Sequence, residues 1–359
     1  MGIRGLYQYL NKRAPRRDTA DTATLSNFDL HIDLLGSHYA LIVRLMTKDY
    51  KRTTSAARAG RAIAAMLRET FNLENQIHLI HIDGVPNQEK AIEHAERNAA
   101  YSKQHGQLQA ALNKMATKSS QGRWTSGTVI KLIHKKLGAV FKLSDADKRT
   151  LIKTLKDLGL PICQCYTEAD ICIADACEDG SSQHLVVSGD SDLLVYESID
   201  SVLRPIPRSS FYAIYDKDDV LDILQFVDPM QLVVLGIVSH SDYAKNIYGF
   251  GIARNAALIR SIPVSDVKTM LATYLLTVAP KVKGTLNLTM FSTALAVFYN
   301  RQQTPVSPIP VERNKDFRDC LGEFETQKAL RVTNAAVLNA NRKGNLPFYK
   351  AKKSKRNQF

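Results

Sequence analysis

The chain has 359 residues, 45% of them hydrophobic, and a formal net charge of +13. This apolar content supports one large or two medium cores and excludes a wholly disordered chain. The positive excess favours a polyanionic partner such as nucleic acid, although a basic enzyme of another kind would carry the same charge. No apolar run approaches the roughly 20 residues that cross a bilayer, so we expect no membrane partner.

Strand and helix patterns alternate along the first two thirds of the chain. Apolar runs of strand length lie at residues 28–33, 76–83, 160–163 and 185–187. Helical periodicity lies at about 38–48, 56–71, 145–158, 169–177 and 229–239. This alternation predicts an α/β fold with a mainly parallel sheet covered by helices on both faces. Ligands of such sheets bind beyond the carboxyl ends of the strands.

Acidic residues stand at those predicted strand ends. Asp33, Asp83 and Asp190 each follow an apolar run, and Asp192 lies two residues after Asp190 in the segment HLVVSGDSDLLVY. Carboxylates brought close together repel, so one pKa rises unless a cation lies between them. Hard divalent cations such as Mg²⁺ or Mn²⁺ prefer oxygen ligands. The pattern therefore predicts a divalent-metal site, whereas the ordinary interpretation of a lone surface acid is solvation.

Residues 98–144 contain no acid but eight basic residues. We interpret this window as a segment that follows a phosphate backbone; a solvated helical insertion is the alternative. Its predicted contacts with that backbone are Lys114, Lys118, Arg123, Lys131, Lys135 and Lys136.

The C-terminal third is predicted to be helical and then disordered. A helical region is expected over 263–341, with prolines near 305–310 marking a linker. The acid-free basic tail at 342–359 is expected to be disordered, with a nuclear-targeting or nucleic-acid role.

The five cysteines are predicted to be reduced thiols of an intracellular protein, because their number is odd and no signal peptide precedes them. Four of them lie between Cys163 and Cys177, but their spacing lacks the paired C-x-x-C of zinc knuckles and argues against zinc.

Five segments in order along residues 1–260 carry a resemblance: MGIRGLYQYL, DGVPNQEK, TEADICIADA, SGDSDLL and SDYAKNIYGFGIARNAA. Together they resemble the flap endonuclease/XPG-type family of structure-specific 5′ nucleases. The resemblance implies a PIN-like nuclease core over 1–262. That core would include an arch-like insertion at about 90–144 and a helix–two-turns–helix element at about 229–262.

The resemblance implies a two-metal site holding two Mg²⁺ ions, for which Mn²⁺ can substitute. Its implied ligands are Asp33, Asp83, Glu168, Asp170, Asp190, Asp192 and Asp242. Asp170 stands where the family has a glutamate, which keeps the charge but shortens the side chain.

Further residues acquire roles by the same resemblance. Lys90 and Arg97 would reach the scissile phosphate from one face of a helix, with helix pairing to nearby glutamates as the alternative. Tyr39 would stack a substrate base, or else be a buried aromatic. Gly2 would lie close to the active site and the DNA.

The helix–two-turns–helix element would hold duplex DNA, with a potassium ion at its turn. Gly249 and Gly251 would allow positive φ and a close approach to phosphate, beside Ala253 and Arg254. Phe250 and Ala253 depart from the commoner residues of the family.

These features favour a metal-dependent DNA endonuclease or 5′ exonuclease that acts on branched, flapped or 5′-ended DNA. A non-catalytic nucleic-acid-binding or regulatory relative of the same fold and an RNA-directed nuclease are the alternatives. We expect a nuclear monomer whose sequence lacks a clear sliding-clamp motif.

Overall fold

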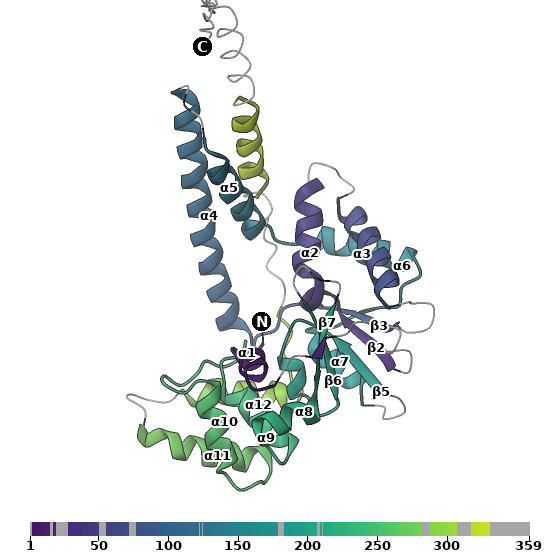
Figure 1. Ribbon diagram of the computed structural model, residues 1–359, viewed down its shortest axis with the longest axis vertical. Coiled ribbons are helices and arrows are strands. Elements are labelled where there is room, and N and C mark those ends of the chain that lie inside the picture. Colours follow the sequence, from purple (N-terminus) through teal and green to yellow (C-terminus); the bar gives the residue numbers. More distant parts are fainter. Residues whose placement is uncertain are drawn as a thin grey trace, which may run out of the picture. The chain divides into compact units, whose positions relative to one another are not determined.

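The computed structural model describes most of the chain (Figure 1). The described residues are 2–14, 17–18, 28–49, 55–71, 77–121, 123, 125–178, 183–206, 209, 211–281, 287–306 and 317–330. The predicted basic tail at 342–359 lies outside them. Internal contacts divide the chain into two units, residues 1–98 with 143–311 and residues 99–142 with 312–359. We describe each unit by itself.

The first unit is built on a seven-stranded sheet. Its strands are β1 (Arg17–Asp18), β2 (Phe28–Asp33), β3 (Ile77–Ile82), β4 (Ile162–Gln164), β5 (Gln183–Val187), β6 (Ser201–Pro205) and β7 (Tyr212–Asp216). Their order is β1-β7-β6-β5-β2-β3-β4, with parallel pairing from β6 to β4 and antiparallel pairing of β7 with β6 and β1. The mainly parallel α/β sheet is therefore confirmed, and the edge formed by β1, β6 and β7 was not predicted.

Strand register places the predicted site at one edge of this sheet. In the centre, β2 pairs with both β3 and β5, so that Asp33 lies opposite His81 and Ile32 opposite Val187. The carboxyl ends of these three strands consequently meet. Side chains alternate along a strand, so Leu30 and Ile32 face one side of the sheet while His31 and Asp33 face the other.

Four helices flank the sheet: α2 (Leu34–Asp49), α3 (Ser55–Phe71), α6 (Asp145–Asp157) and α7 (Ala169–Ala176). In α3, Ala59, Ile63 and Leu67 recur at helical spacing and are all buried. Helix α3 packs against α2 and α6, and the three lie together in Figure 1. Helix α7 contacts β2 and β3. It comes directly after β4 and carries Asp170 toward the strand ends.

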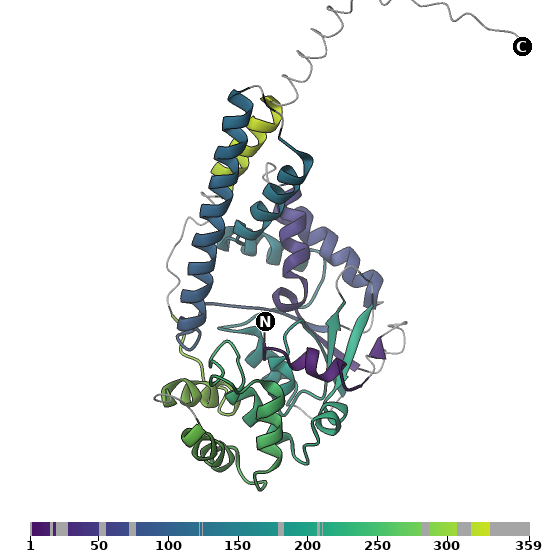
Figure 2. The same cartoon turned by 60° about the vertical axis from the view of Figure 1, so that its left-hand side comes forward.

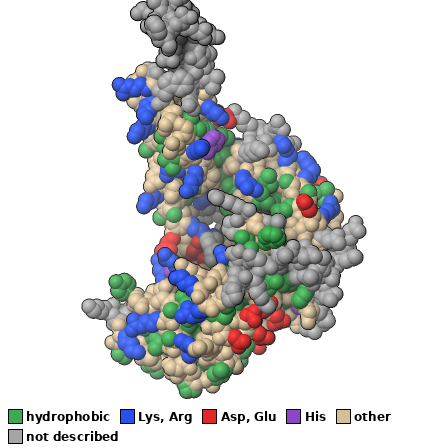
Figure 3. All heavy atoms as spheres, viewed as in Figure 1, with side chains coloured by type: hydrophobic (Ala, Val, Ile, Leu, Met, Phe, Trp, Pro, Cys, Tyr) green, Lys and Arg blue, Asp and Glu red, His purple; other side chains and the backbone are tan. Residues whose placement is uncertain are grey.

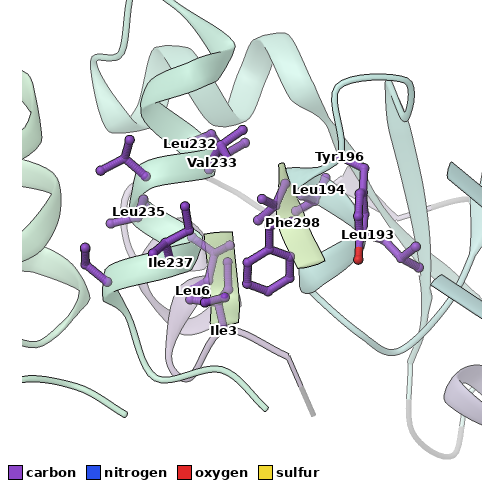
Figure 4. Close-up of a cluster of buried hydrophobic side chains, with 14 of the residues drawn as sticks. Ile3, Leu6, Leu193, Leu194, Tyr196, Leu232, Val233, Leu235, Ile237 and Phe298 are labelled. Carbon is purple, nitrogen blue, oxygen red and sulfur yellow. The ribbon is translucent and has the colours of Figure 1, made fainter. Parts of the chain in front are cut away.

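A helical layer completes the first unit. It contains α1 (Leu6–Asn11), η2 (Asp192–Val195), α8 (Lys217–Leu224), α9 (Pro229–Val238), α10 (Ile252–Arg260), α11 (Val267–Val278), η3 (Ala279–Lys281) and α12 (Leu288–Phe298). Helices α9–α12 are green in Figure 2. Helix α9 begins with a capping box at Asp228 and Gln231, and its last eight residues are all buried. It forms the centre of the apolar cluster in Figure 4, which Leu6 and Phe298 join.

No single helix among the described residues is long and apolar enough to cross a membrane. Helices α8 and α9 meet that criterion only as a pair, bent by 73° at their junction.

The second unit combines the basic insertion with a distant part of the chain. It contains most of α4 (Ala91–Ser120), all of α5 (Gly127–Val140) and the helical residues 317–330. Phe317 packs edge-on against Phe141, and Phe324 against His134. The insertion is thus a packed helical unit that includes a C-terminal segment. The domain boundaries at 262 and 341 stay a prediction, but the described part of 263–341 is divided between the two units.

Candidate active site

Asp33 and Asp83 end neighbouring strands and are held by short hydrogen bonds. Asp33 Oδ1 accepts from the Gly36 amide at 2.8 Å, and its Oδ2 accepts from Ser188 Oγ at 2.7 Å. Asp83 Oδ1 accepts from the Ala169 amide at 2.8 Å, at the first residue of α7. These bonds fix both carboxylates at the carboxyl ends of β2 and β3 and bring Asp83 to the start of α7.

Asp190 and Asp192 follow β5 in a tight turn. The Asp190 amide donates to Ser188 Oγ at 3.1 Å, and the Asp192 amide donates to Asp190 Oδ1 at 3.3 Å. Asp192 is only 1% exposed, and its Oδ1 is buried with no hydrogen-bond partner. A buried carboxylate oxygen without a donor is costly unless a cation satisfies it.

Glu168, Asp170 and Asp242 complete the acidic set from α7 and from the loop after α9. Lys90 lies among them: its Nζ is 2.8 Å from Glu168 Oε2 and 3.3 Å from Asp242 Oδ2. Arg97 Nη2 is 3.2 Å from the same oxygen of Asp242. Arg97 also forms the helix pair with Glu93 that sequence reasoning kept as its alternative. Arg97 therefore contacts an acid of the cluster, Asp242, and an acid of its own helix, Glu93, at the same time.

The seven acids interact as one electrostatic cluster. Burial and the charge of Asp83 raise the pKa of Asp33 to about 7. Burial and Asp190 likewise raise the pKa of Asp170 well above its ordinary value. Asp192 has a raised pKa for the same reasons, with Asp242 adding to it. The sequence-predicted set of Asp33, Asp83, Glu168, Asp170, Asp190, Asp192 and Asp242 is thus brought together in the fold.

Lys90 offsets part of this negative charge. Burial alone favours its neutral amine, but Tyr243, Glu168, Asp170 and Asp242 outweigh burial and raise the pKa of Lys90 well above its ordinary value. Lys90 consequently stays charged at neutral pH inside the cluster.

The donor set fits hard divalent cations. All seven candidate ligands are carboxylates, and Asp192, whose buried Oδ1 has no hydrogen-bond partner, has the like charges of Asp190 and Asp242 near it. The compact groups of potential metal ligands among the described residues are made of His and Cys, and these acids, which repel one another, are not among them. Bound divalent ions would relieve this repulsion and satisfy the buried oxygen.

Gly2 lies directly against Asp190. Its φ is +78°, and a Cβ there would collide with the Asp190 carboxylate and come within 2.6 Å of the Ser191 amide nitrogen. Only glycine fits this position without displacing the acid. A hollow of about 540 Å³ adjoins Gly2 and Asp242 and is also lined by Arg4 and Lys245.

Tyr39 lies on α2 and is 39% exposed, so part of its ring is open to a partner. Burial of the remainder raises the pKa of its hydroxyl. The structure therefore leaves room for base stacking, which stays a prediction.

The loop between α9 and α10 has one of its two predicted positive φ angles. Gly249 has φ 82°, whereas Gly251 is extended at φ −84° and ψ 177° and caps α10. Arg254 donates to the Gly249 carbonyl at 3.3 Å and lies 4.1 Å from the ring centre of Phe250. Ala253 is exposed on the first turn of α10, which contains no acid. Duplex binding and a potassium ion here stay predictions.

The predicted DNA contacts of the insertion all lie in the second unit. Lys114, Arg123, Lys131 and Lys135 are exposed. Lys118 and Lys136 are half-buried, and Lys136 donates to Gln107. Figure 3 shows Lys and Arg side chains distributed along these helices.

Sequence reasoning missed several residues of this region. Asn87 donates to Glu168 Oε1 at 3.3 Å, and Ser188 holds Asp33. Both lie inside the quoted motifs, so a signal for them was present. The sequence analysis also missed a row of three buried histidines, His31, His81 and His184, on the face of the sheet that carries Asp33. His31 Nδ1 is 3.1 Å from His81 Nε2, and His31 Nε2 is 3.2 Å from His184 Nδ1.

Comparison with known proteins identifies the fold through structure and not through sequence. No known protein family matches the sequence, and no curated protein does. The catalytic core of Rad2 in complex with a DNA substrate aligns at TM-score 0.51 and 12% identity, covering 93% of this chain and 100% of that one. Flap endonuclease-1 from Methanococcus jannaschii aligns at TM-score 0.50 and 15% identity, covering 92% and 99%. The chain therefore has the fold of the flap endonuclease/XPG-type nucleases.

Proposed function

We propose that the protein is a metal-dependent, structure-specific endonuclease or 5′ exonuclease that hydrolyses phosphodiester bonds in branched, flapped or 5′-ended DNA. The observation that carries this proposal is the convergence of seven acids at the carboxyl ends of β2, β3 and β5, with a buried lysine among them. A relative that has lost catalysis has no need to keep a set of mutually repelling buried carboxylates. The DNA complex of Rad2 supports DNA as the substrate.

Two Mg²⁺ ions held by the seven acids would supply an activated water and stabilise the leaving oxygen. The residues of the chain then have distinct tasks. Ser188 and the Gly36 amide orient Asp33, and the Ala169 amide orients Asp83. Lys90 and Arg97 would neutralise charge that develops on the scissile phosphate. Their contacts with Asp242 hold Lys90 inside the acidic cluster and the more exposed Arg97 beside it.

DNA would be held by separate surfaces outside the acidic cluster. The backbone from Gly249 to Arg254 would contact duplex phosphates, with a potassium ion at its turn. Tyr39 would stack a base, and the exposed lysines of the insertion would follow a phosphate backbone. We propose a nuclear monomer for this activity.

The test uses labelled flap, bubble, nicked, junction and RNA substrates with Mg²⁺ or Mn²⁺. We expect the wild type to cut at least one branched or 5′-ended DNA. Asp190→Ala should abolish cleavage while DNA binding persists, and Asp218→Ala, which changes an exposed acid on α8, should leave cleavage intact. Retained cleavage in Asp190→Ala would refute the site. Tight DNA binding by a wild type that cuts nothing would favour the non-catalytic relative.

A further inference from the structure

A second group of potential metal ligands lies on the face of the sheet that α7 covers. His81 of β3 pairs in register with Cys163 of β4, so the two side chains share one face. Cys165 follows two residues later on the same face, and Cys172 comes from α7, which contacts β3. Three secondary-structure elements thus converge on one point.

The distances among these four side chains match a tetrahedral ion. One ligand atom from each of His81, Cys163, Cys165 and Cys172 lies within 4.8 Å of all the others. Cys163 Sγ is 3.6 Å from Cys172 Sγ, and Cys165 Sγ is 3.9 Å from His81 Nδ1. Zinc–ligand bonds of about 2.3 Å to sulfur and 2.0 Å to nitrogen place tetrahedral S···S pairs about 3.8 Å apart and S···N pairs about 3.5 Å apart.

We propose that His81, Cys163, Cys165 and Cys172 bind a structural Zn²⁺ ion, separate from the carboxylate centre. Three thiolates and an imidazole are soft and borderline ligands, which select zinc over Mg²⁺. His81 and Cys165 are buried, while Cys163 and Cys172 are half-buried. The ion therefore has a route from solvent and a largely enclosed final position.

The row of histidines supplies the outer support that metal-bound imidazoles need. Zinc on His81 Nδ1 leaves the proton on Nε2, which then donates to His31 Nδ1 at 3.1 Å. His31 Nε2 in turn donates to His184 Nδ1 at 3.2 Å. Both hydrogen bonds form when His81 and His31 each carry their proton on Nε2 and His184 accepts at Nδ1.

The ion would position the acids without touching a substrate. His81 lies two residues before Asp83, and Cys172 lies two residues after Asp170. Cys165 precedes Glu168 by three residues. Strand β4 has three residues and α7 has eight, so neither is long enough to be rigid by itself. Cross-linking β3, β4 and α7 through one ion would fix the backbone that carries all three acids.

The sequence argued against zinc because the cysteines lack paired knuckle spacing. The fold supplies the fourth ligand from β3, more than 80 residues earlier in the chain, as Cys165 and His81 are 84 positions apart. A search by local spacing cannot find such a site.

The experiment measures metal content, which is independent of nuclease activity. The full chain is produced in zinc-supplemented medium, purified under reducing conditions and washed with excess Mg²⁺ before elemental analysis. We expect about one zinc ion per chain. Cys163→Ser and Cys172→Ser should lower this content severalfold, while Cys320→Ser, a buried cysteine of the second unit, should retain it. Asp190→Asn should also retain it, because that acid belongs to the other centre.

Cobalt substitution keeps the test decisive if a cysteine variant fails to fold. The wild type with Co²⁺ should show intense thiolate-to-cobalt charge-transfer bands and the visible spectrum of a tetrahedral site. Folded, reduced wild type without zinc and without these bands would overturn the proposal. So would zinc that survives in folded Cys163→Ser, or a Cys163–Cys172 disulfide in the protein purified under native conditions.

Discussion

The Lys90 ammonium lies 2.8 Å from Glu168 Oε2, and only 7% and 16% of the two side chains are exposed. This buried cation lies inside a cluster of seven acids and pairs with two of them. Lys90 therefore has two tasks: it limits repulsion among the acids, and in the proposed reaction it faces the scissile phosphate.

We predict that Lys90→Met lowers both stability and cleavage. Removing one partner of a buried pair leaves an uncompensated charge and costs about 3–5 kcal/mol. Urea unfolding without divalent ions should show this loss, and single-turnover cleavage should fall roughly 10²-fold. Lys245→Met, which breaks the half-exposed pair with Glu96, should leave the stability close to that of the wild type, because solvent screens such a pair. Equal losses of stability in both variants would contradict the special role of Lys90.

Gly2 and Gly5 form a matched pair, since both have positive φ, at 78° and 87°. Alanine at either position carries a backbone cost of about 1–2 kcal/mol. At Gly5 the new methyl group meets nothing closer than Ile252 at 3.9 Å, whereas at Gly2 it collides with the Asp190 carboxylate. Cleavage assays should therefore show loss of activity in Gly2→Ala, with Gly5→Ala close to wild type. Wild-type cleavage by Gly2→Ala would mean that Asp190 tolerates displacement.

The raised pKa of Asp33 predicts a pH-dependent effect of Mg²⁺ on stability. Its folded-state pKa of about 7 exceeds the ordinary 3.8, so without divalent ions the folded state binds the extra proton between these values. The stability contributed by Asp33 is present below about pH 4 and is lost as pH rises through 7. Mg²⁺ binds the ionised form and should stabilise the protein more at pH 8 than at pH 5.

Thermal unfolding with EDTA and with Mg²⁺ across this pH range tests the point. Saturating ion at 100 times its Kd would contribute about 2.7 kcal/mol. Asp33→Asn should reduce the pH dependence, because the amide does not titrate, while Asp170 and Asp192 keep their own contributions. An Mg²⁺ effect that is equal at pH 5 and pH 8 would argue against ion binding at these acids.

The exposed lysines of the insertion predict salt-sensitive DNA binding. Replacing Lys114, Lys131 and Lys135 by glutamine removes up to three phosphate contacts, and each contributes about 0.9 to the slope of log K against log[salt]. Binding titrations from low to high salt should therefore show a slope that is shallower by up to about 2.7. The same change at Lys156, Lys268 and Lys281, exposed on the first unit, serves as the control. An equal change of this slope in the two triple variants would show that the insertion contributes no more to DNA binding than the first unit does.

The sequence predicted the centre of the fold better than its edges. Strands β2, β3 and β5 were found because each is an apolar run with an acid at its end or shortly after it, and the same fact located Asp33, Asp83 and Asp190. Strands β6 and β7 were missed because SVLRP and YAIYD are short and mix polar with apolar residues. The grouping of His81 with Cys172 could not be predicted either, since it depends on strand register and on where α7 packs.

The helix at 317–330 shows the same limit. Its pattern predicts a helix but contains nothing that selects the insertion as its partner, because apolar helix faces fit many surfaces.

That partnership has a consequence for the order in which the chain matures. Phe141 and Phe317 pack against each other, yet residues 142–316 separate them along the chain. Their contact cannot form before Phe317 has been synthesised. A ribosome that has released residues up to 311 has already delivered every strand and every acid of the first unit. The acids of the first unit can therefore come together before the basic helices of the second unit gain the support of residues 317–330.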